Sequence, residues 1–253
     1  MQPILAVFYR EYKIRATNMV WLFYDLCLPL GYLLIFGVGF TQVTQGQVLW
    51  AGAPLSYNAF FLGGVLAMAS FGIAIGTAWG FFTDRDNGIF YEFLTYPLSR
   101  GQFLFGKVIF NVLVSVAQTL LTVLSAAVLL GVPVRVGLLP WLLAGMAVGT
   151  AGWFFFLSIF ALRIHRNDVF NTIMNFFYFF LLFASSMFYP LEPLPGWMRS
   201  VSWANPLTWQ ADFLRYASLG IGDGRRLALE AALFCGFTVV SFWVAARTLV
   251  SRD

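Results

Sequence analysis

Residues 57–83 read YNAFFLGGVLAMASFGIAIGTAWGFFT, and residues 84–100 continue DRDNGIFYEFLTYPLSR; this change from apolar to polar sequence decides the fold. The first part carries no charged side chain and exceeds the roughly 20 apolar residues that a helix needs to cross a bilayer. Another apolar run of membrane length follows the second part. A charged block held between two such runs indicates a surface on which another molecule docks.

Five further apolar runs are long enough to span, at residues 19–40, 103–130, 138–162, 169–189 and 227–249. The whole chain of 253 residues is 60% hydrophobic and 10% charged, whereas soluble domains average about 25% charged residues. Lipid offers no hydrogen-bond partner to free backbone groups, so the runs are expected to be helices. We predict an all-α integral membrane protein with six transmembrane helices, forming one transmembrane domain over residues 1–253.

The basic residues predict which ends of the spans face the cytoplasm. Ten lie on the side of the two termini, namely Arg10, Lys13, Arg15, Arg85, Arg100, Lys107, Arg163, Arg166, Arg247 and Arg252. Five lie on the other side, at Arg135, Arg199, Arg215, Arg225 and Arg226. The positive-inside rule then makes both termini cytoplasmic. The net charge of +4 reflects this topology and does not indicate nucleic-acid binding. We expect the protein in the cytoplasmic (inner) membrane of a bacterium or archaeon.

Residues 1–18 are predicted to form an amphipathic helix at the membrane interface. Ile4, Leu5, Phe8 and Tyr12 can share one face, while the basic residues lie elsewhere, which suits a helix lying among lipid headgroups. Such a helix can serve as a simple topogenic anchor, or it can also help to hold a cytoplasmic partner.

Two patterns inside the spans concern packing. Gly72, Gly76 and Gly80 recur every four residues in the second run, and Gly145 and Gly149 repeat the spacing in the fourth. Such stripes let helices approach closely; we interpret both as intramolecular packing and not as a dimer contact. The fifth run is the most aromatic stretch, and its candidate substrate-path residues are Phe176, Phe177, Phe180 and Tyr189. These rings can form a lipid-facing belt, pack in the core, or line a path for an amphipathic cargo.

The polar block at 84–100 has the composition of a short cytoplasmic helix. Its acids, Asp84 and Glu92 among them, lie near the start, where the helix dipole favours negative charge, and Pro97 ends it. Its apolar face includes Leu94 and is unusual for a free loop. The block is therefore either an interfacial linker or a knob that fits a groove on a soluble partner. Lys107, at the entry of the next span, is expected to snorkel to the headgroups.

A second polar island, residues 189–205, lies on the opposite side and belongs to an interrupted segment, residues 190–222. Pro190, Pro193 and Pro195 prevent a continuous helix, and Trp197 prefers the membrane interface. The segment is too apolar for a free loop and too interrupted for a span. We predict short re-entrant helices that dip into the outer leaflet before the last span.

Catalytic and cofactor chemistry finds little support in the sequence. His165 is the only histidine, so no cluster for metal binding or nucleophilic catalysis is expected, and no residue is assigned a catalytic, metal or cofactor role. Intramembrane charges usually mark ion paths, but Asp25 lies only about one turn from the cytoplasmic end of its span. A proton-coupled transporter usually needs an acid nearer the midplane. Asp25 receives no assigned role.

Two motifs in order resemble one family. DNGIFYEFLTYPLSRGQFLFGK (residues 86–107) and FYPLEPLPGWMRSVSWANPLTWQADFLR (residues 188–215) resemble segments of the permease of type-2 ATP-binding-cassette (ABC) exporters, in the branch that exports drugs and lipo-oligosaccharides. The length and the six-span topology agree across nearly the whole chain.

The resemblance implies a permease homodimer associated with two copies of a separate ATPase, which would bind the ATP and Mg²⁺. The first, second and fifth spans would line the substrate path. The coupling helix that meets the ATPase would include Asp84, Gly88, Glu92, Leu94, Pro97 and Leu98. The exit helices would include Pro190, Pro193, Pro195, Trp197, Asn205, Pro206 and Leu207. The expected activity is outward transport of an amphipathic lipid, glycan, glycolipid or drug-like molecule.

Other functions stay open at this point. A secondary transporter or channel, a membrane-embedded enzyme and a non-transporting membrane scaffold are the alternatives. The first would show ion-gradient dependence, the second needs a cluster of acids and histidines at one interface, and the third would dock a partner without moving cargo.

Overall fold

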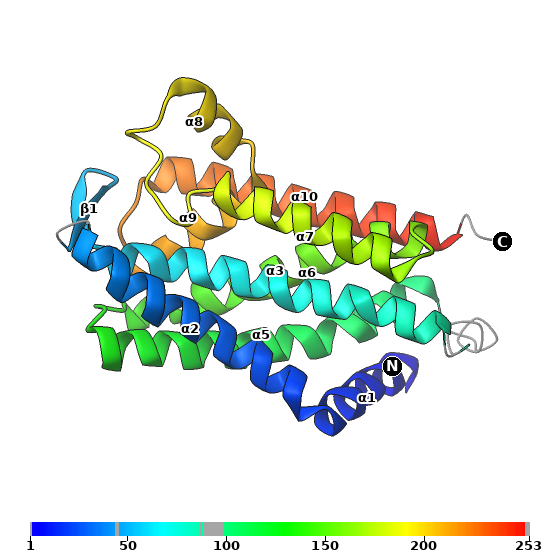
Figure 1. Ribbon diagram of the computed structural model, residues 1–253. Coiled ribbons are helices and arrows are strands. Elements are labelled where there is room, and N and C mark those ends of the chain that lie inside the picture. Colours follow the sequence, from blue (N-terminus) through cyan, green and yellow to red (C-terminus); the bar gives the residue numbers. More distant parts are fainter. Residues whose placement is uncertain (1, 44–45, 87, 89–98, 251–253) are drawn as a thin grey trace.

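Long helices make up most of the chain, as the composition predicts (Figure 1). The computed structural model describes residues 2–43, 46–86, 88 and 99–250. In chain order the elements are α1 (Gln2–Thr17), α2 (Met19–Val43), β1 (Gln47–Trp50), β2 (Ala53–Ser56), α3 (Tyr57–Asp86), α5 (Arg100–Leu130), the 3₁₀ turn η1 (Val136–Leu138), α6 (Leu139–Arg163), α7 (Asn167–Phe183), α8 (Gly196–Trp203), α9 (Pro206–Leu219) and α10 (Gly224–Val250).

Five of the described helices are long and apolar enough to cross a membrane: Phe23–Val43, Tyr57–Phe82, Gly101–Leu130, Val136–Arg163 and Gly224–Thr248. The predicted fifth run, 169–189, corresponds to α7, a helix of 17 residues that ends at Phe183. The chain turns there because Ser186 is hydrogen-bonded to α9. Its backbone amide donates to Thr208 Oγ1, and its hydroxyl donates to Asp212 Oδ1. A sixth span, formed by α7, stays a prediction.

Helix α3 forms the core of the bundle. In its most apolar stretch 83% of the residues are buried inside the chain, whereas in that of α2 only 17% of the residues are buried. Two glycines let other segments approach α3 closely. A Cβ on Gly63 would lie 2.8 Å from the backbone of α9 at Ala211, and one on Gly64 would lie 2.7 Å from Met187. Small residues thus replace bulky ones where α3 meets α9 and the turn after α7.

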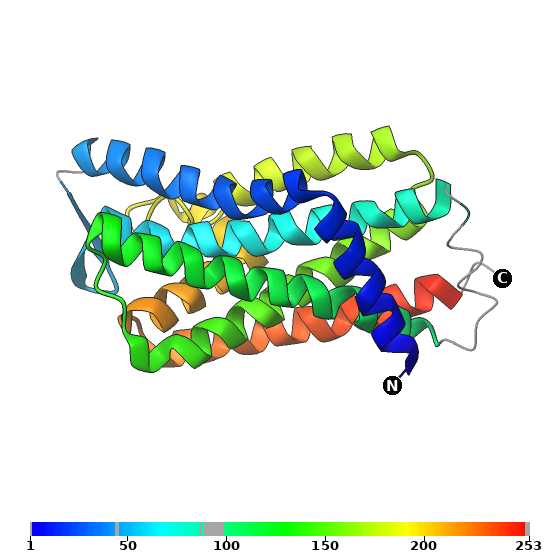
Figure 2. The same cartoon turned by 90° about the horizontal axis from the view of Figure 1, so that it is seen from below.

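The bundle has two distinct ends (Figures 1 and 2). The β-hairpin, α8 and α9 lie toward one end, and α1 and the C-terminal end of α10 lie at the other. Helix α1 crosses α5 at an angle (Figure 2), and a Cβ on Gly106 of α5 would lie 2.6 Å from Val7. Helix α1 and the C-terminal end of α10 therefore lie at the same end of the bundle (Figures 1 and 2).

The hairpin of β1 and β2 is a correction to the purely helical prediction. The two strands pair antiparallel, with Gln47 opposite Ser56 and Trp50 opposite Ala53. Their two-residue turn has positive φ at both Ala51 and Gly52, the geometry of the tight turns that match strand twist. Alanine is an uncommon residue there, which is why the sequence carried no hairpin signal.

Candidate functional site

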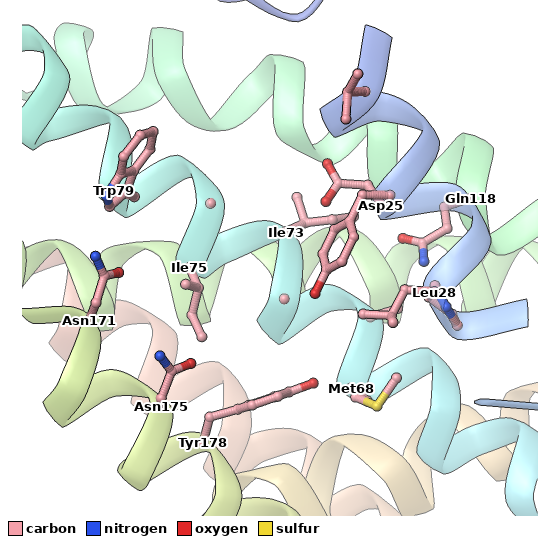
Figure 3. Close-up of a pocket in the computed structure, with 16 residues that line it drawn as sticks. Asp25, Leu28, Met68, Ile73, Ile75, Trp79, Gln118, Asn171, Asn175 and Tyr178 are labelled. Atoms are coloured by element: carbon pink, nitrogen blue, oxygen red, sulfur yellow. The ribbon is translucent and has the colours of Figure 1, made fainter. Parts of the chain in front are cut away.

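A cavity of about 590 Å³ opens between α2, α3 and α7 (Figure 3). One further residue, Gln118 of α5, completes its wall. Figure 3 shows Asp25, Leu28 and Gln118 on one side of the space and Trp79, Asn171 and Asn175 on the other. The first, second and fifth predicted spans are the three helices that the resemblance expects around a substrate path.

The acid in this wall already has a counter-ion. Asp25 is 8% exposed, and its Oδ2 lies 2.5 Å from Nη1 of Arg15, at the C-terminal end of α1. Arg15 also donates to Asn111 Oδ1 at 3.4 Å. Asp25 had no assigned role; the structure shows that it ties α1 to α2. Because the pair is formed inside the chain, the cavity wall carries no uncompensated charge at this point.

The α7 side of the cavity presents polar side chains. Asn171, Asn175 and Tyr178 line the space and follow a spacing of four and three residues, which places them on one helical face. Asn171 Nδ2 donates to Asn167 Oδ1 at 2.8 Å, and Trp79 Nε1 donates to the same oxygen at 2.7 Å. This polar face was not predicted, because phenylalanines dominate the composition of the helix around it.

The four predicted path residues do not line this cavity. Phe176 and Phe180 are 75% and 53% exposed, on the outer surface of the chain. Phe177 packs on Phe156 with ring centroids 5.8 Å apart, and the Tyr189 hydroxyl donates to the Phe183 carbonyl. Their place on a substrate path stays a prediction, and the cavity itself uses the opposite, polar face of α7.

The glycine stripe of α3 has another role than the one predicted. A Cβ on Gly72 would meet nothing within 4 Å, and one on Gly76 would meet only the Arg15 guanidinium, at 3.5 Å. Both glycines line the cavity, so they widen it and do not bring two helices together. The packing prediction is confirmed for the stripe of α6, where a Cβ on Gly149 would overlap the Gln210 side chain.

A buried cluster of charges lies where α1 meets α3 and α5. Asp84, 2% exposed, pairs with Arg10 and, at 2.8 Å, with Lys107. Lys107 also pairs with Glu11 at 2.8 Å. Burial opposes ionisation of the Asp84 carboxyl, but the charges of Lys107 and Arg10 outweigh it and hold its pKa below the ordinary value. The cluster fastens α1 to both helices that flank residues 87–98.

This cluster corrects one expectation and leaves another open. Lys107 is 1% exposed, so it does not snorkel to the headgroups; two carboxylates hold it inside. Asp84 points into the same cluster, and Gly88 is exposed with a positive φ of 73°. Glu92, Leu94, Pro97 and Leu98 lie outside the described residues, so the contact of this segment with an ATPase stays a prediction.

The proposed exit segment contains two short helices, α8 and α9. Asn205 caps α9 by accepting from Leu207 N at 2.9 Å, and its Nδ2 donates to Leu181 O at 2.8 Å. Pro206 occupies the first turn, where its missing N–H costs nothing, and Leu207 is fully buried. The Asn-Pro-Leu sequence thus starts a helix and anchors it to the end of α7.

The preceding prolines and the tryptophan lie nearer the surface. Pro193, Pro195 and Trp197 are exposed, the last at 71%, and Pro190 is partly buried. Pro195 precedes the first residue of α8. Figure 1 shows α8 standing off the bundle. Whether α8 and α9 enter the outer leaflet stays a prediction.

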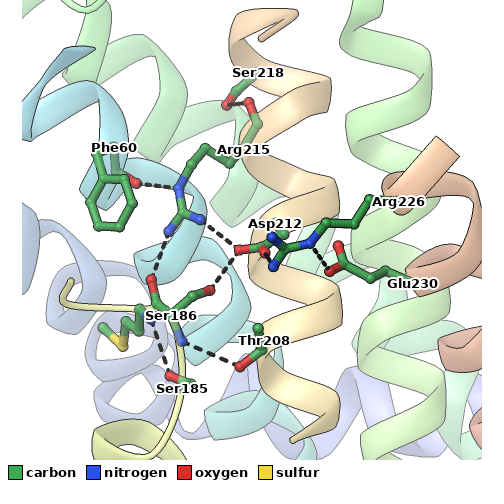
Figure 4. Close-up of polar contacts among 10 residues, drawn as sticks. Phe60, Ser185, Ser186, Thr208, Asp212, Arg215, Ser218, Arg226 and Glu230 are labelled. Atoms are coloured by element: carbon green, nitrogen blue, oxygen red, sulfur yellow. Dashed lines mark hydrogen bonds and ion pairs between the residues drawn. The ribbon is translucent and has the colours of Figure 1, made fainter. Parts of the chain in front are cut away.

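Arg215 of α9 organises a buried polar network (Figure 4). Its guanidinium donates to Phe60 O, Asp212 Oδ1 and Ser186 O at 2.8, 2.7 and 2.9 Å, and it lies over the rings of Trp50 and Phe60. Arg215 is fully buried. The network joins α3, the turn after α7, and α9.

The network continues to α10 through Arg226. This side chain lies 3.2 Å from Asp212 and 2.8 Å from Glu230. The positive-inside count treated Arg215 and Arg226 as outer loop charges, but both contribute to internal packing in this structure. The Asp-x-x-Arg spacing of residues 212–215, which places both side chains on one helical face, was the available signal.

Known proteins similar to the chain are transporter permeases. The sequence profile of the ABC-2 type transporter family matches residues 2–219. A daunorubicin resistance ABC transporter permease protein of Streptomyces coeruleorubidus is 29% identical over 83% of this chain and 74% of its own length. A putative transport permease of Cyanophora paradoxa is 24% identical, over 85% of this chain and 74% of its own. A probable multidrug ABC transporter permease of Escherichia coli K12 is 24% identical, over 68% and 48%.

Proposed function

Because this chain belongs to the ABC-2 type transporter family, and so is a membrane subunit of an ABC transporter, we propose that it exports an amphipathic molecule with energy supplied by a separate ATPase. The observation that carries the proposal is that one helix, α3, connects the cavity to residues 87–98, the segment that we propose docks on the ATPase. Helix α3 lines the cavity from Met68 to Trp79 and runs on to Asp86, directly before residues 87–98.

In the proposed mechanism, α3 transmits movement of residues 87–98 to the cavity. The ATPase binds residues 87–98 and moves them when it binds ATP. The charge cluster of Arg10, Glu11, Asp84 and Lys107 keeps α1, α3 and α5 together at this end, so the three helices move as a unit. Movement of α3 relative to α2 and α7 then changes the shape of the cavity. ATP and Mg²⁺ are bound by the partner, and this chain holds neither.

We propose that two copies of the chain pair around two such cavities. Large apolar side chains on α2 and α7 are exposed at the surface of the single chain, among them Phe23, Ile35, Phe176 and Phe179. Part of this surface faces the second copy and part faces lipid. The end with α1 and the C-terminus of α10 lies at the cytoplasmic side of the inner membrane, where the ATPase is available, and α8 and α9 lie toward the exit.

The proposed substrate is a lipid, a glycan or glycolipid, or a drug-like compound. The cavity supports an amphipathic one, because its wall combines amides with apolar and aromatic side chains. One relative is named for resistance to daunorubicin and another as a probable multidrug permease, and these names favour a drug-like molecule here.

Co-purification tests the proposal. The tagged chain is extracted from its native membranes in mild detergent, and bound proteins are identified and quantified. We expect a stoichiometric soluble subunit with an intact phosphate-binding loop. Leu94→Arg is expected to remove it, whereas Gln47→Arg, an exposed change in β1 at the opposite end, is expected to retain it.

Two results would contradict the proposal. Recovery of the chain alone, under conditions that keep other membrane complexes intact, would favour a gradient-driven transporter, a channel or a scaffold. An ATPase that stays bound to Leu94→Arg would show that residues 87–98 are not the docking segment.

A further inference from the structure

Gln118 of α5 carries a buried amide that makes no hydrogen bond to the described part of the chain. The side chain is 1% exposed, and neither its amide nitrogen nor its oxygen has a partner among the residues that the structure describes. Buried polar groups are nearly always paired, because a lone donor or acceptor loses its bonds to water and gains nothing in return. An unpaired amide in the middle of an apolar helix such as α5 therefore calls for a partner from outside the chain.

The position of Gln118 indicates where that partner binds. Gln118 is the residue through which α5 reaches the cavity of α2, α3 and α7. Figure 3 shows Gln118 on the same side of the space as Asp25 and Leu28; Asp25 is already paired with Arg15, and the Leu28 side chain has no hydrogen-bonding group. Both amide atoms are shielded from solvent, so a molecule in the cavity becomes their partner when the Gln118 side chain turns toward the space that it lines.

The α3 wall leaves room for such a molecule. No atom lies within 4 Å of the place where a Cβ on Gly72 would be. Trp79, further along α3, and Tyr178, on α7, also line the cavity, and Tyr178 is held in place by stacking on Phe71, with ring centroids 4.9 Å apart. A flat apolar body that occupies the space beside Gly72 can pack against these aromatic rings.

The charges of the wall decide the nature of the polar group. The acid of the wall does not favour a cation, because Asp25 is already paired with Arg15 at 2.5 Å. An anion would need a free base, and the Arg15 guanidinium is occupied by Asp25 and Asn111. The amide of Gln118 offers one acceptor and one donor group without net charge. Its complement is a neutral group that also donates and accepts, of which a hydroxyl is the simplest.

We infer that Gln118 determines specificity in this cavity and selects an amphipathic substrate with a neutral hydroxyl on a flat apolar body. The inference rests on the proposed function, since it takes the cavity as the substrate site. It narrows the proposed substrates to one chemical class. It also gives α5, a helix outside the three that form the cavity, a part in recognition.

Three probes with the same body test this inference. They are 1-pyrenebutanol, 1-butylpyrene and 1-pyrenebutylamine, which end in a hydroxyl, a methyl and, at neutral pH, an ammonium group. The purified full chain is placed in lipid nanodiscs, and binding is followed by energy transfer from tryptophan to pyrene. Gly72→Leu, which fills the cavity, gives the background that arises from probe dissolved in lipid. Gln118→Met keeps the length of the side chain and removes both hydrogen-bonding groups.

The expected result is a preference for the hydroxyl that depends on Gln118. Wild type should bind 1-pyrenebutanol about tenfold more tightly than either other probe, because two hydrogen bonds between neutral groups contribute about that much. Gln118→Met should abolish the difference and leave binding of 1-butylpyrene unchanged. The midpoint of thermal unfolding, measured for both variants, verifies that each is folded.

Each contrary result has its own meaning. If Gly72→Leu weakens binding but Gln118→Met leaves the order of the three probes unchanged, the cavity is a binding site and the role of Gln118 is refuted; a bound water then satisfies the amide. Preference of wild type for the ammonium probe would also refute it. If Gly72→Leu weakens none of the probes, the cavity is not the site, and the path assigned under the proposed function fails with it.

Discussion

Arg215→Met is the substitution for which the structure gives the clearest prediction. Methionine fills much of the volume of the arginine stem and can still pack on Trp50 and Phe60. It cannot replace the three hydrogen bonds that the guanidinium gives to Phe60 O, Asp212 Oδ1 and Ser186 O. The variant therefore removes polar contacts with a limited change in packing.

The loss is large because the site is fully buried. Arg215 is 0% and Asp212 is 1% exposed, so water cannot replace the missing charge. Removing one partner of a buried ion pair costs about 3–5 kcal/mol, because the other charge stays buried without compensation. Arg226 still lies 3.2 Å from Asp212, which favours the lower part of this range. In a chain of this size about 1 kcal/mol lowers the unfolding midpoint by roughly 2–4 °C, so we expect a decrease of roughly 10 °C.

Thermal unfolding of the purified protein in detergent measures this decrease. Arg225→Met is the control, because Arg225 is a neighbouring arginine with an exposed side chain, and it should change the midpoint by no more than roughly 2 °C. Adding Asp212→Asn to Arg215→Met should cost less than the sum of the two single changes, since the second removes the charge that the first left unpaired. Equal midpoints for Arg215→Met and Arg225→Met would refute the assignment of Arg215 as a packing residue.

Three further predictions concern packing, capping and charge. Gly149→Ala should cost about 1–3 kcal/mol, because its Cβ would overlap Gln210, whose amide is held at both ends by hydrogen bonds; Gly72→Ala, which faces open space, should unfold at the wild-type midpoint or slightly above it. Asn205→Ala should cost about 1–2 kcal/mol through the lost cap of α9, and Asn205→Ser, which keeps a capping oxygen without placing a charge near Leu181 O, should cost less in the same assay. The pKa of Asp84 is lowered in the folded chain, so its stabilisation is complete above its unfolded pKa and is lost as the pH falls through the lower, folded value. The difference in midpoint between wild type and Asp84→Asn should accordingly stay constant down to about pH 4 and shrink below it; a difference that shrinks near neutral pH would contradict the assigned charge cluster.

The spans could be predicted because the bilayer imposes a length and a composition on each of them. Five apolar runs correspond to five long helices, since a membrane helix must satisfy its backbone within itself. The end of α7 could not be predicted in this way. It ends at Phe183 because Ser186 bonds to Thr208 and Asp212 of α9, and contacts between segments distant in sequence leave no local pattern.

The cavity was predicted only as a set of helices. The resemblance pointed to the first, second and fifth spans, which form it, but the residue assignments relied on the abundance of aromatic side chains. Asn175 and Tyr178 line the space while Phe176 faces outward, and only the rotation of α7 in the bundle decides this. The role of Gln118 could not be predicted from local sequence, because the residues around its side chain belong to other helices.

The ion pairs of the buried cluster could not be predicted from the sequence either. Lys107 and Glu11 are 96 residues apart, and Asp84 and Arg10 are separated by 74. Counting charges per loop assigns such residues to one side of the membrane but cannot show that they pair. The buried position of Lys107 follows from the two carboxylates that compensate it, and without them burial of a lysine would be too costly.

Accessibility of the cavity at each stage of ATP hydrolysis tests the central claim most directly. Cys27 and Cys235 are replaced by serine, Gly72→Cys places one thiol at the cavity wall, and a membrane-impermeant maleimide is applied to the cytoplasmic face of vesicles that contain the chain with its ATPase. We predict that ATP plus vanadate changes the labelling rate at residue 72, and that Leu94→Arg abolishes the change. A labelling rate that is the same with and without nucleotide would contradict the account, because the cavity would then be independent of the partner proposed to drive it.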